Sequence, residues 1–180
     1  DHPSIEIDLT ESVLNGGWEA LENDRIDLLV GAPGPIPRHK GFRGVEINSS
    51  ELLLVAAKHH PLTKLHNKPE DLKKSLEKTR RIIIHDTSTA NIVRSAGLLS
   101  NEYTMYVATL EQKISAQLAG IGVGHLPRSA IQSHLKNGDL VIFGKQADRL
   151  NDYIAWKTGH RGKGLQTLAT MLSNCDWSLI

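Results

Sequence analysis

The sequence predicts an α/β fold whose sheets are covered by helices on both faces. Stretches with the alternating apolar pattern of strands are interleaved with stretches that have the longer apolar period of helices. Two short runs, residues 52–55 (LLLV) and 82–84 (III), are apolar throughout. Such runs are typical of strands buried on both faces of a parallel sheet. From this pattern alone a single sheet is expected, although 180 residues suffice for one large core or two small lobes.

The chain is expected to alternate between strands and helices from its first residues onward. The first strand rests on the alternation of Ile5, Ile7 and Leu9 with polar residues, and the first helix carries Trp18 in its apolar stripe. The predicted strands lie near residues 4–10, 26–31, 42–47, 51–57, 82–86, 103–108, 121–126, 139–143 and 151–157. The predicted helices lie near residues 12–23, 69–77, 89–98, 109–119, 128–136 and 162–174.

The most informative stretch is residues 111–140, which predicts a helix, a buried strand and a second helix. Leu110, Ile114 and Leu118 recur at helical spacing, so they form one apolar stripe. Gly120 then occupies the position where a left-handed helix cap is expected. The order along this stretch is helix, Ala-Gly-x-Gly-x-x-x-Leu-Pro, helix, Gly-x-Leu.

This order resembles the C-terminal effector-binding domain of LysR-type transcriptional regulators. The resemblance covers nearly the whole chain. It is also carried by His2-Pro3 before the first strand, the 24–31 segment (DRIDLLVG), the series His59-His60-Pro61-Leu62, and Glu70-Asp71-Leu72. It implies two Rossmann-like lobes of the type II periplasmic-binding-protein fold. Lobe I would be residues 1–57 plus 149–180 and lobe II residues 58–148, with crossings near Ala57-Lys58 and near 148–151.

The resemblance also implies segments that the family places before the first strand seen here. These are a further strand and helix of lobe I, and the winged helix-turn-helix that reads DNA. The chain carries no counterpart of them, so we expect contact with DNA only through an N-terminal domain that is absent from this chain.

The composition argues against a nucleic-acid-binding, membrane-binding or membrane-spanning protein. Lys and Arg number 21 against 20 Asp and Glu, so the chain lacks the overall positive field that holds nucleic acid or an anionic membrane. Cys175 is the single cysteine and cannot form an internal disulfide, which favours a reducing compartment. No apolar run approaches the roughly 20 residues of a membrane span. A cytoplasmic protein is therefore expected.

Hydroxyl side chains follow several of the predicted strands. Ligands of open α/β folds bind at the carboxyl ends of strands, and helix N-termini beside hydroxyls suit a carboxylate or phosphate. In the family the loops at these places line the effector cleft, so we expect a small anionic metabolite there. The predicted effector-binding residues are Thr10, Ser12, Ala32, Pro33, Thr87, Ser88, Thr89 and Thr109.

Simple helix capping is the alternative at each of these positions. Thr109 with Gln112 fits a capping box, so capping is expected to be its main role. Residues 87–89 hold more hydroxyls than one cap requires, which favours ligand contact. The loop 31–35 (GAPGP) either lets a ligand approach the backbone or is only a rigid turn.

Enzymatic and metal-binding alternatives find little support in the sequence. The glycines at 120–124 run from helix to strand, the reverse of a nucleotide-binding turn, and no cysteine or histidine cluster has zinc spacing. His85-Asp86 beside Thr87 lacks the setting of a catalytic triad. His125 is either a satisfied strand histidine or a polar contact in the cleft or dimer seam. Neither cofactor, metal nor enzymatic activity is expected.

The resemblance thus implies the effector-sensing and oligomerisation domain of a bacterial LysR-type DNA-binding regulator. A small inducer would bind between the lobes and re-set a homodimer or tetramer, for whose contacts segment 4–10 and helix 109–119 are the exposed candidates. The alternative is an extracytoplasmic solute-binding protein of a transporter, which shares the two-lobe fold.

Overall fold

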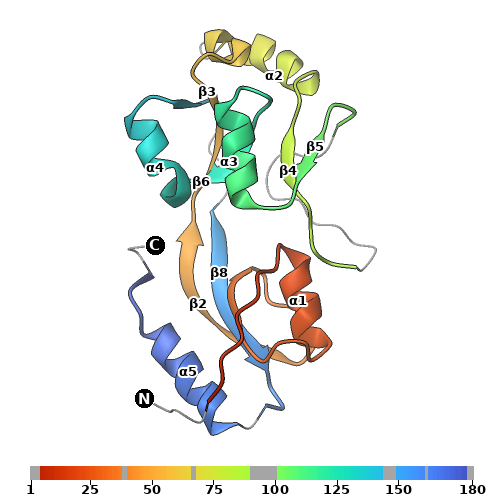
Figure 1. The fold of residues 1–180 in the computed structure, drawn as a ribbon, viewed down its shortest axis with the longest axis vertical. Coiled ribbons are helices and arrows are strands. Elements are labelled where there is room, and N and C mark those ends of the chain that lie inside the picture. Colours follow the sequence, from red (N-terminus) through yellow and green to blue (C-terminus); the bar gives the residue numbers. More distant parts are fainter. Residues whose placement is uncertain are drawn as a thin grey trace. The chain divides into compact units, whose positions relative to one another are not determined.

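The computed structural model describes residues 5–37, 40–65, 68–89, 101–143, 149–160 and 162–177, without the side chains of 48–50 (Figure 1). The helices are α1 (Asn15–Glu22), α2 (Pro69–Glu77), α3 (Leu110–Leu118), α4 (Arg128–Lys136) and α5 (Lys163–Ser173), with a 3-10 turn η1 (Pro61–Leu65). The strands are β1 (Leu29–Pro33), β2 (Phe42–Ser50), β3 (Leu52–Ala57), β4 (Ile82–Ile84), β5 (Met105–Val107), β6 (Gly124–Pro127), β7 (Leu140–Ile142) and β8 (Leu150–Lys157). In the part that the structure describes, no helix is both long and apolar enough to cross a membrane.

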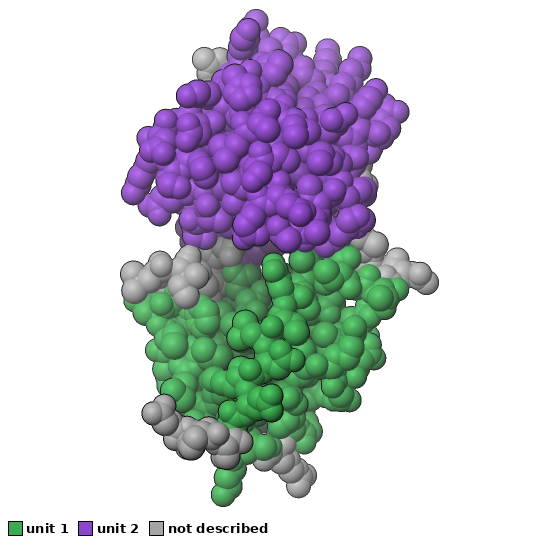
Figure 2. Space-filling model, viewed as in Figure 1, with its two compact units in different colours: residues 1–49, 86–94, 151–180 green, residues 50–85, 95–150 purple. Residues whose placement is uncertain are grey.

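The chain divides into two compact units (Figure 2). Unit 1 comprises residues 1–49, 86–94 and 151–180, and unit 2 comprises residues 50–85 and 95–150. The chain therefore enters unit 2 before β3, and it returns to unit 1 for a short stretch directly after β4.

Unit 1 is built on a three-stranded sheet in the order β1-β8-β2. β1 and β8 are antiparallel, and their register shifts between Val30 and Ala32. The core joins α1 to this sheet through the buried residues Trp18, Leu21, Ala32 and Ala155. The indole ring of Trp18 packs at 5.6 Å from the ring of Phe42. One apolar stripe of α1 thus holds the helix against the strands that carry the 31–35 loop.

Unit 2 is organised around β3, every residue of which is buried. β3 lies between β6 and β7 and is antiparallel to both. One face of β3 packs into a core with Leu72 and Phe143, while the other packs into a core with Ile131 and the apolar stripe of α3. Figure 1 shows α3 beside β3 and β4. β4 and β5 form a parallel pair, and a parallel bridge from Arg81 to Val123 links β4 to the start of β6.

Two expectations about strands are wrong. Residues 5–10 form no strand, and Ile5, Ile7 and Leu9 are 47%, 65% and 88% exposed. The segment pairs with no described strand, and alternation alone does not pair a backbone. The apolar run of β3 does report burial on both faces, but its partners are antiparallel rather than parallel.

The predicted lobes differ from the two units in where β3 belongs. The prediction places β3 in lobe I, whereas its ladders to β6 and β7 join it to unit 2. Residues 86–94, predicted in lobe II, belong to unit 1. The predicted helix 89–98 lies almost wholly outside the described residues. The lobes closing around a cleft remain a prediction.

Candidate functional site

The segment that follows β4 clamps the start of helix α1. The Asp86 carboxylate oxygen Oδ1 accepts hydrogen bonds from the backbone N–H of Gly16 at 3.1 Å and of Ser88 at 2.9 Å. The Thr87 hydroxyl accepts from the N–H of Val13 at 2.9 Å and donates to the Val13 carbonyl at 3.2 Å. Asp86 is therefore a second acceptor for the Gly16 N–H, which also donates to the Val13 carbonyl at 3.0 Å, and it lies at the end of α1 that favours negative charge.

Ser88 and Thr89 surround the carboxylate of Glu19, which α1 presents to them. The Ser88 hydroxyl donates to Oε2 at 2.6 Å, and the Thr89 N–H donates to the same atom at 2.7 Å. The Thr89 hydroxyl donates to Oε1 at 2.5 Å, and the Arg25 guanidinium reaches Oε1 at 3.1 Å. Three donors from two consecutive residues therefore converge on one carboxylate, as an anion cradle requires.

The close approach of the two segments depends on a glycine of α1. A Cβ added to Gly16 would lie 1.9 Å from the Thr87 hydroxyl oxygen and 2.9 Å from the Thr87 carbonyl carbon. Because one of these atoms belongs to the backbone, a side-chain rotation alone could not make room. Gly16 thus allows the hydroxyl segment to contact α1.

The remaining predicted residues of unit 1 are arranged differently. Thr10 and Ser12 are exposed and precede α1, which has no side-chain cap at its N-cap residue Leu14. Ala32 is buried in the core, and the Pro33 carbonyl accepts a 3.0 Å hydrogen bond from the Trp18 indole N–H. The structure therefore brings the 87–89 hydroxyls together with α1, whereas the 31–35 loop is anchored by core packing.

Thr109, in unit 2, is the N-cap of α3. Its hydroxyl accepts a 3.2 Å hydrogen bond from the N–H of Gln112, which confirms the predicted capping role. The Gln112 side-chain oxygen reaches back to the N–H of Ala108 at 2.9 Å, one residue earlier than in a standard capping box. Any contact between Thr109 and a ligand would therefore be additional to this structural role.

Two titratable groups beside α3 are absent from the predicted site. Lys113 is 6% exposed, and burial lowers the pKa of its amine to about 8. Burial, and to a smaller extent the charge of Lys113, lowers the pKa of His125 to about 4, so its imidazole is neutral near pH 7. In the sequence, only the position of Lys113 next to the apolar stripe of the helix indicated that it could be buried. Lys113 and Gln117 directly precede Ile114 and Leu118 of the apolar stripe, so both lie at its margin.

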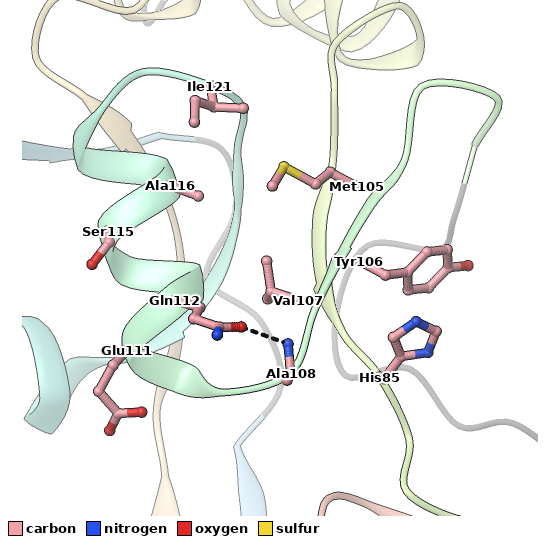
Figure 3. A pocket seen from close by; sticks show the side chains of 10 residues that line it. All are labelled: His85, Met105, Tyr106, Val107, Ala108, Glu111, Gln112, Ser115, Ala116 and Ile121. Carbon is pink, nitrogen blue, oxygen red and sulfur yellow. Dashed lines mark hydrogen bonds between the residues drawn. The ribbon is translucent and has the colours of Figure 1, made fainter.

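An open groove of about 640 Å³ lies between α3 and β5 (Figure 3). Met105, Val107 and Ala116 face the space between the two elements, while the Tyr106 ring stacks on His85 with ring centroids 4.6 Å apart. The groove contains none of the predicted effector-binding residues. Its mainly apolar lining offers few partners for an anion.

A family comparison matches residues 1–174 to the LysR substrate binding domain. The chain belongs to this family. Two relatives from Escherichia coli K12 are named as an uncharacterized HTH-type transcriptional regulator, YeeY, and a probable HTH-type transcriptional regulator, YhaJ. YeeY is 30% identical over 140 residues, which are 78% of this chain and 45% of YeeY. YhaJ is 31% identical over 167 residues, which are 89% of this chain and 53% of YhaJ. The chain thus spans about half the length of these relatives.

Solved regulatory domains share the fold of this LysR substrate binding domain. The regulatory domain of CcmR from Synechocystis PCC6803, in complex with 2-PG, aligns with a TM-score of 0.70 and 18% identity over 96% of this chain and 84% of that one. Full-length LysG from Corynebacterium glutamicum, with bound effector Arg, aligns with a TM-score of 0.59 and 17% identity over 89% of this chain and 55% of that one. The predicted periplasmic-binding-protein-like α/β fold is thereby confirmed.

Proposed function

We propose that this LysR substrate binding domain senses a small anionic metabolite and that a carboxylate of the metabolite binds at residues 87–89. The observation that carries the proposal is the cradle around Glu19, because Ser88 and Thr89 already direct three donors at a carboxylate. A ligand carboxylate would compete with Glu19 for these donors. CcmR and LysG, which share the fold, were solved with 2-PG and Arg bound, which supports small-molecule sensing in general.

Residues 86–89 connect β4 of unit 2 with the contacts to α1 of unit 1, so a ligand that binds them could alter those contacts. The segment leaves β4 of unit 2 and makes its described contacts with α1 of unit 1. A ligand that replaces Glu19 would therefore loosen one of the links between the chain segment and α1. The domain would then have two arrangements, one with Glu19 bound by Ser88 and Thr89 and one with the ligand in its place. The ligand shifts the balance between them only by the difference between its affinities for the two. Thr10, Ser12, the Ala32-Pro33 loop and Thr109 are proposed to complete the effector site.

In the whole protein, we place this domain in a cytoplasmic, DNA-binding LysR-type regulator that works as a homodimer or tetramer. DNA would be bound by a separate N-terminal domain, since the charge of the present chain is nearly balanced. The rival role, a solute-binding protein of a transporter, has less support because YeeY and YhaJ are both named as transcriptional regulators. The family is one of regulators rather than enzymes, so we propose no catalytic activity.

A thermal-shift screen of small organic acids tests the proposal. A ligand at 100 times its dissociation constant adds about 2.7 kcal/mol of stability. Each kcal/mol moves the melting temperature of such a domain by roughly 2–4 °C, so a hit should raise it by several degrees. Ser88→Ala should reduce that shift, and Thr109→Val should reduce it if Thr109 contacts the ligand. Loss of capping alone would lower the starting melting temperature and leave the shift intact. A ligand that keeps its full shift in both variants would place the site elsewhere.

A further inference from the structure

Helix α3 directs two polar side chains, one turn apart, into the interior of unit 2. Gln117 is fully buried, and its amide, oriented to satisfy its partners, donates to the carbonyls of Val55 at 3.1 Å and Gly124 at 3.3 Å. Lys113 is nearly as buried, but within the described part of the chain its ammonium forms no hydrogen bond or ion pair. Gln117 therefore has a complete structural role, whereas Lys113 is a largely buried residue whose ammonium has no acidic partner among the described residues.

The course of the Lys113 side chain follows from its neighbours on β6. A Cβ added to Gly124 would lie 3.1 Å from Lys113 Cε and 2.9 Å from the side-chain amide of Gln117, so the missing side chain of Gly124 leaves room for both. The ammonium lies close enough to His125, the next residue, for its charge to lower the pKa of that imidazole. The stem of Lys113 thus crosses Gly124 and its charged end lies toward His125.

This direction leads to the carboxyl ends of the parallel strands in unit 2. β4 runs parallel to β5, and the bridge from Arg81 to Val123 makes the start of β6 parallel to β4 as well. Helix α3 begins at the same end, directly after β5 and its cap Thr109. Long helical side chains also lean toward the helix N-terminus, so Lys113 points toward the first turn of its own helix.

We infer that Lys113 and the first turn of α3 form a binding site for the anionic oxygens of a small ligand, either a carboxylate or a phosphate. The first N–H groups of a helix have no partner in the helical ladder, and that end of the helix dipole is positive. A largely desolvated amine that has no acidic partner among the described residues is less favourable in its charged form, and an anionic oxygen would supply a partner. The inference rests on the proposed sensing of an anionic metabolite and adds Lys113 as a residue that selects for its charge.

The direct test is an NMR titration of the domain labelled with 13C at lysine Cε, in which the Lys113→Met variant assigns the Lys113 signal. Acetate and inorganic phosphate serve as separate probes, with chloride at equal ionic strength as the control. We expect one of the two anions to raise the pKa of Lys113 toward its ordinary value, because a bound anion stabilises the protonated amine. The signal of Lys136, on the outward side of α4, should stay unchanged. Because the titration uses the wild-type chain, it does not depend on how a variant folds.

Affinity measurements separate this site from the cradle at Ser88. Lys113→Met should weaken binding of the responding anion at least tenfold, while Gln117→Met, a matched change at the neighbouring buried polar residue, should preserve the Lys113 response. If neither acetate nor phosphate changes the Lys113 titration beyond chloride, the inference is wrong, even where an organic acid stabilises the domain through Ser88. A response at Lys113 without any stabilising organic acid would instead support the site and contradict the proposed sensing function.

Discussion

The Ser88 hydroxyl donates a 2.6 Å hydrogen bond to the carboxylate of Glu19, which lies 69 residues earlier in the chain. Thr89 adds two donors to the same carboxylate and Arg25 a third. The chain therefore supplies its own anion to the hydroxyl segment on which the proposed effector site is based. Any anionic effector that uses these hydroxyls must compete with the Glu19 carboxylate of α1.

Glu19→Gln should enlarge the melting-temperature shift caused by an anionic ligand, because the variant removes the negative charge that competes for Ser88 and Thr89. The unliganded domain should be less stable by about 1–2 kcal/mol, since hydrogen bonds to a charged group are lost. Glu22→Gln, which removes an exposed carboxylate paired with Lys40, is the matched control. A smaller ligand shift in Glu19→Gln would mean that Glu19 helps to hold the ligand.

Gly16→Ala should destabilise the domain, although alanine normally stabilises a helix interior. Its Cβ would collide with Thr87, including a backbone atom 2.9 Å away, so the segment or α1 must move. Overpacking of this kind costs about 1–3 kcal/mol, or several degrees in a thermal melt. Gly17→Ala is the control in the same helix, because its Cβ would meet only the Leu29 side chain. Equal melting temperatures for the two variants would contradict the proposed tight contact.

Trp18→Phe should cost about 1–3 kcal/mol, because it leaves the Pro33 carbonyl without the indole N–H at 3.0 Å. The loss would loosen the 31–35 loop, whose Ala32 and Pro33 belong to the proposed effector site. Chemical denaturation followed by circular dichroism measures the change. Trp156→Phe, where the indole makes no hydrogen bond to described residues, should cost less. Similar costs at the two tryptophans would show that ring packing, rather than this hydrogen bond, anchors the loop.

His125 should make the domain less stable as the pH falls from about 6.5 to about 4. The folded imidazole has a pKa of about 4, whereas the unfolded chain takes up the proton near the ordinary value of 6.5. Between these values the unfolded state binds more protons, so acidification favours unfolding. After allowance for solvent screening the effect is on the order of 1–2 kcal/mol. His125→Leu should flatten this part of the stability curve. An unchanged curve in His125→Leu would contradict the burial of this side chain.

Local signals in the sequence predicted most helices well. α2 and α4 have the predicted bounds, because Pro69 is favoured in a first turn and Asn137-Gly138 ends a helix. Strand direction was less predictable. The apolar run of β3 reports that both of its faces are covered, and this is equally true of a central antiparallel strand. The segment 5–10 had the alternation of a strand but no partner in the described residues.

The candidate site was predictable only where it depends on neighbours in sequence. Thr109 and Gln112 lie within one helical turn, so their capping interaction could be recognised directly. Glu19 could not be assigned to Ser88, since nothing local pairs residues so far apart. Lys113 was missed for a related reason, because a lysine on a helix is ordinarily exposed. Only the close packing of α3 over Gly124 buries it.

By itself, the sequence determined the α/β character, the family and the local caps, because these depend on periodicity and on interactions within a few residues. Tertiary structure alone decided that β3 pairs antiparallel with β6 and β7, that Glu19 fills the hydroxyl cradle, and that Lys113 is buried. These three outcomes depend on which segments, far apart in the sequence, pack against one another. That choice is made by packing of the whole unit and is not encoded in any short window of residues.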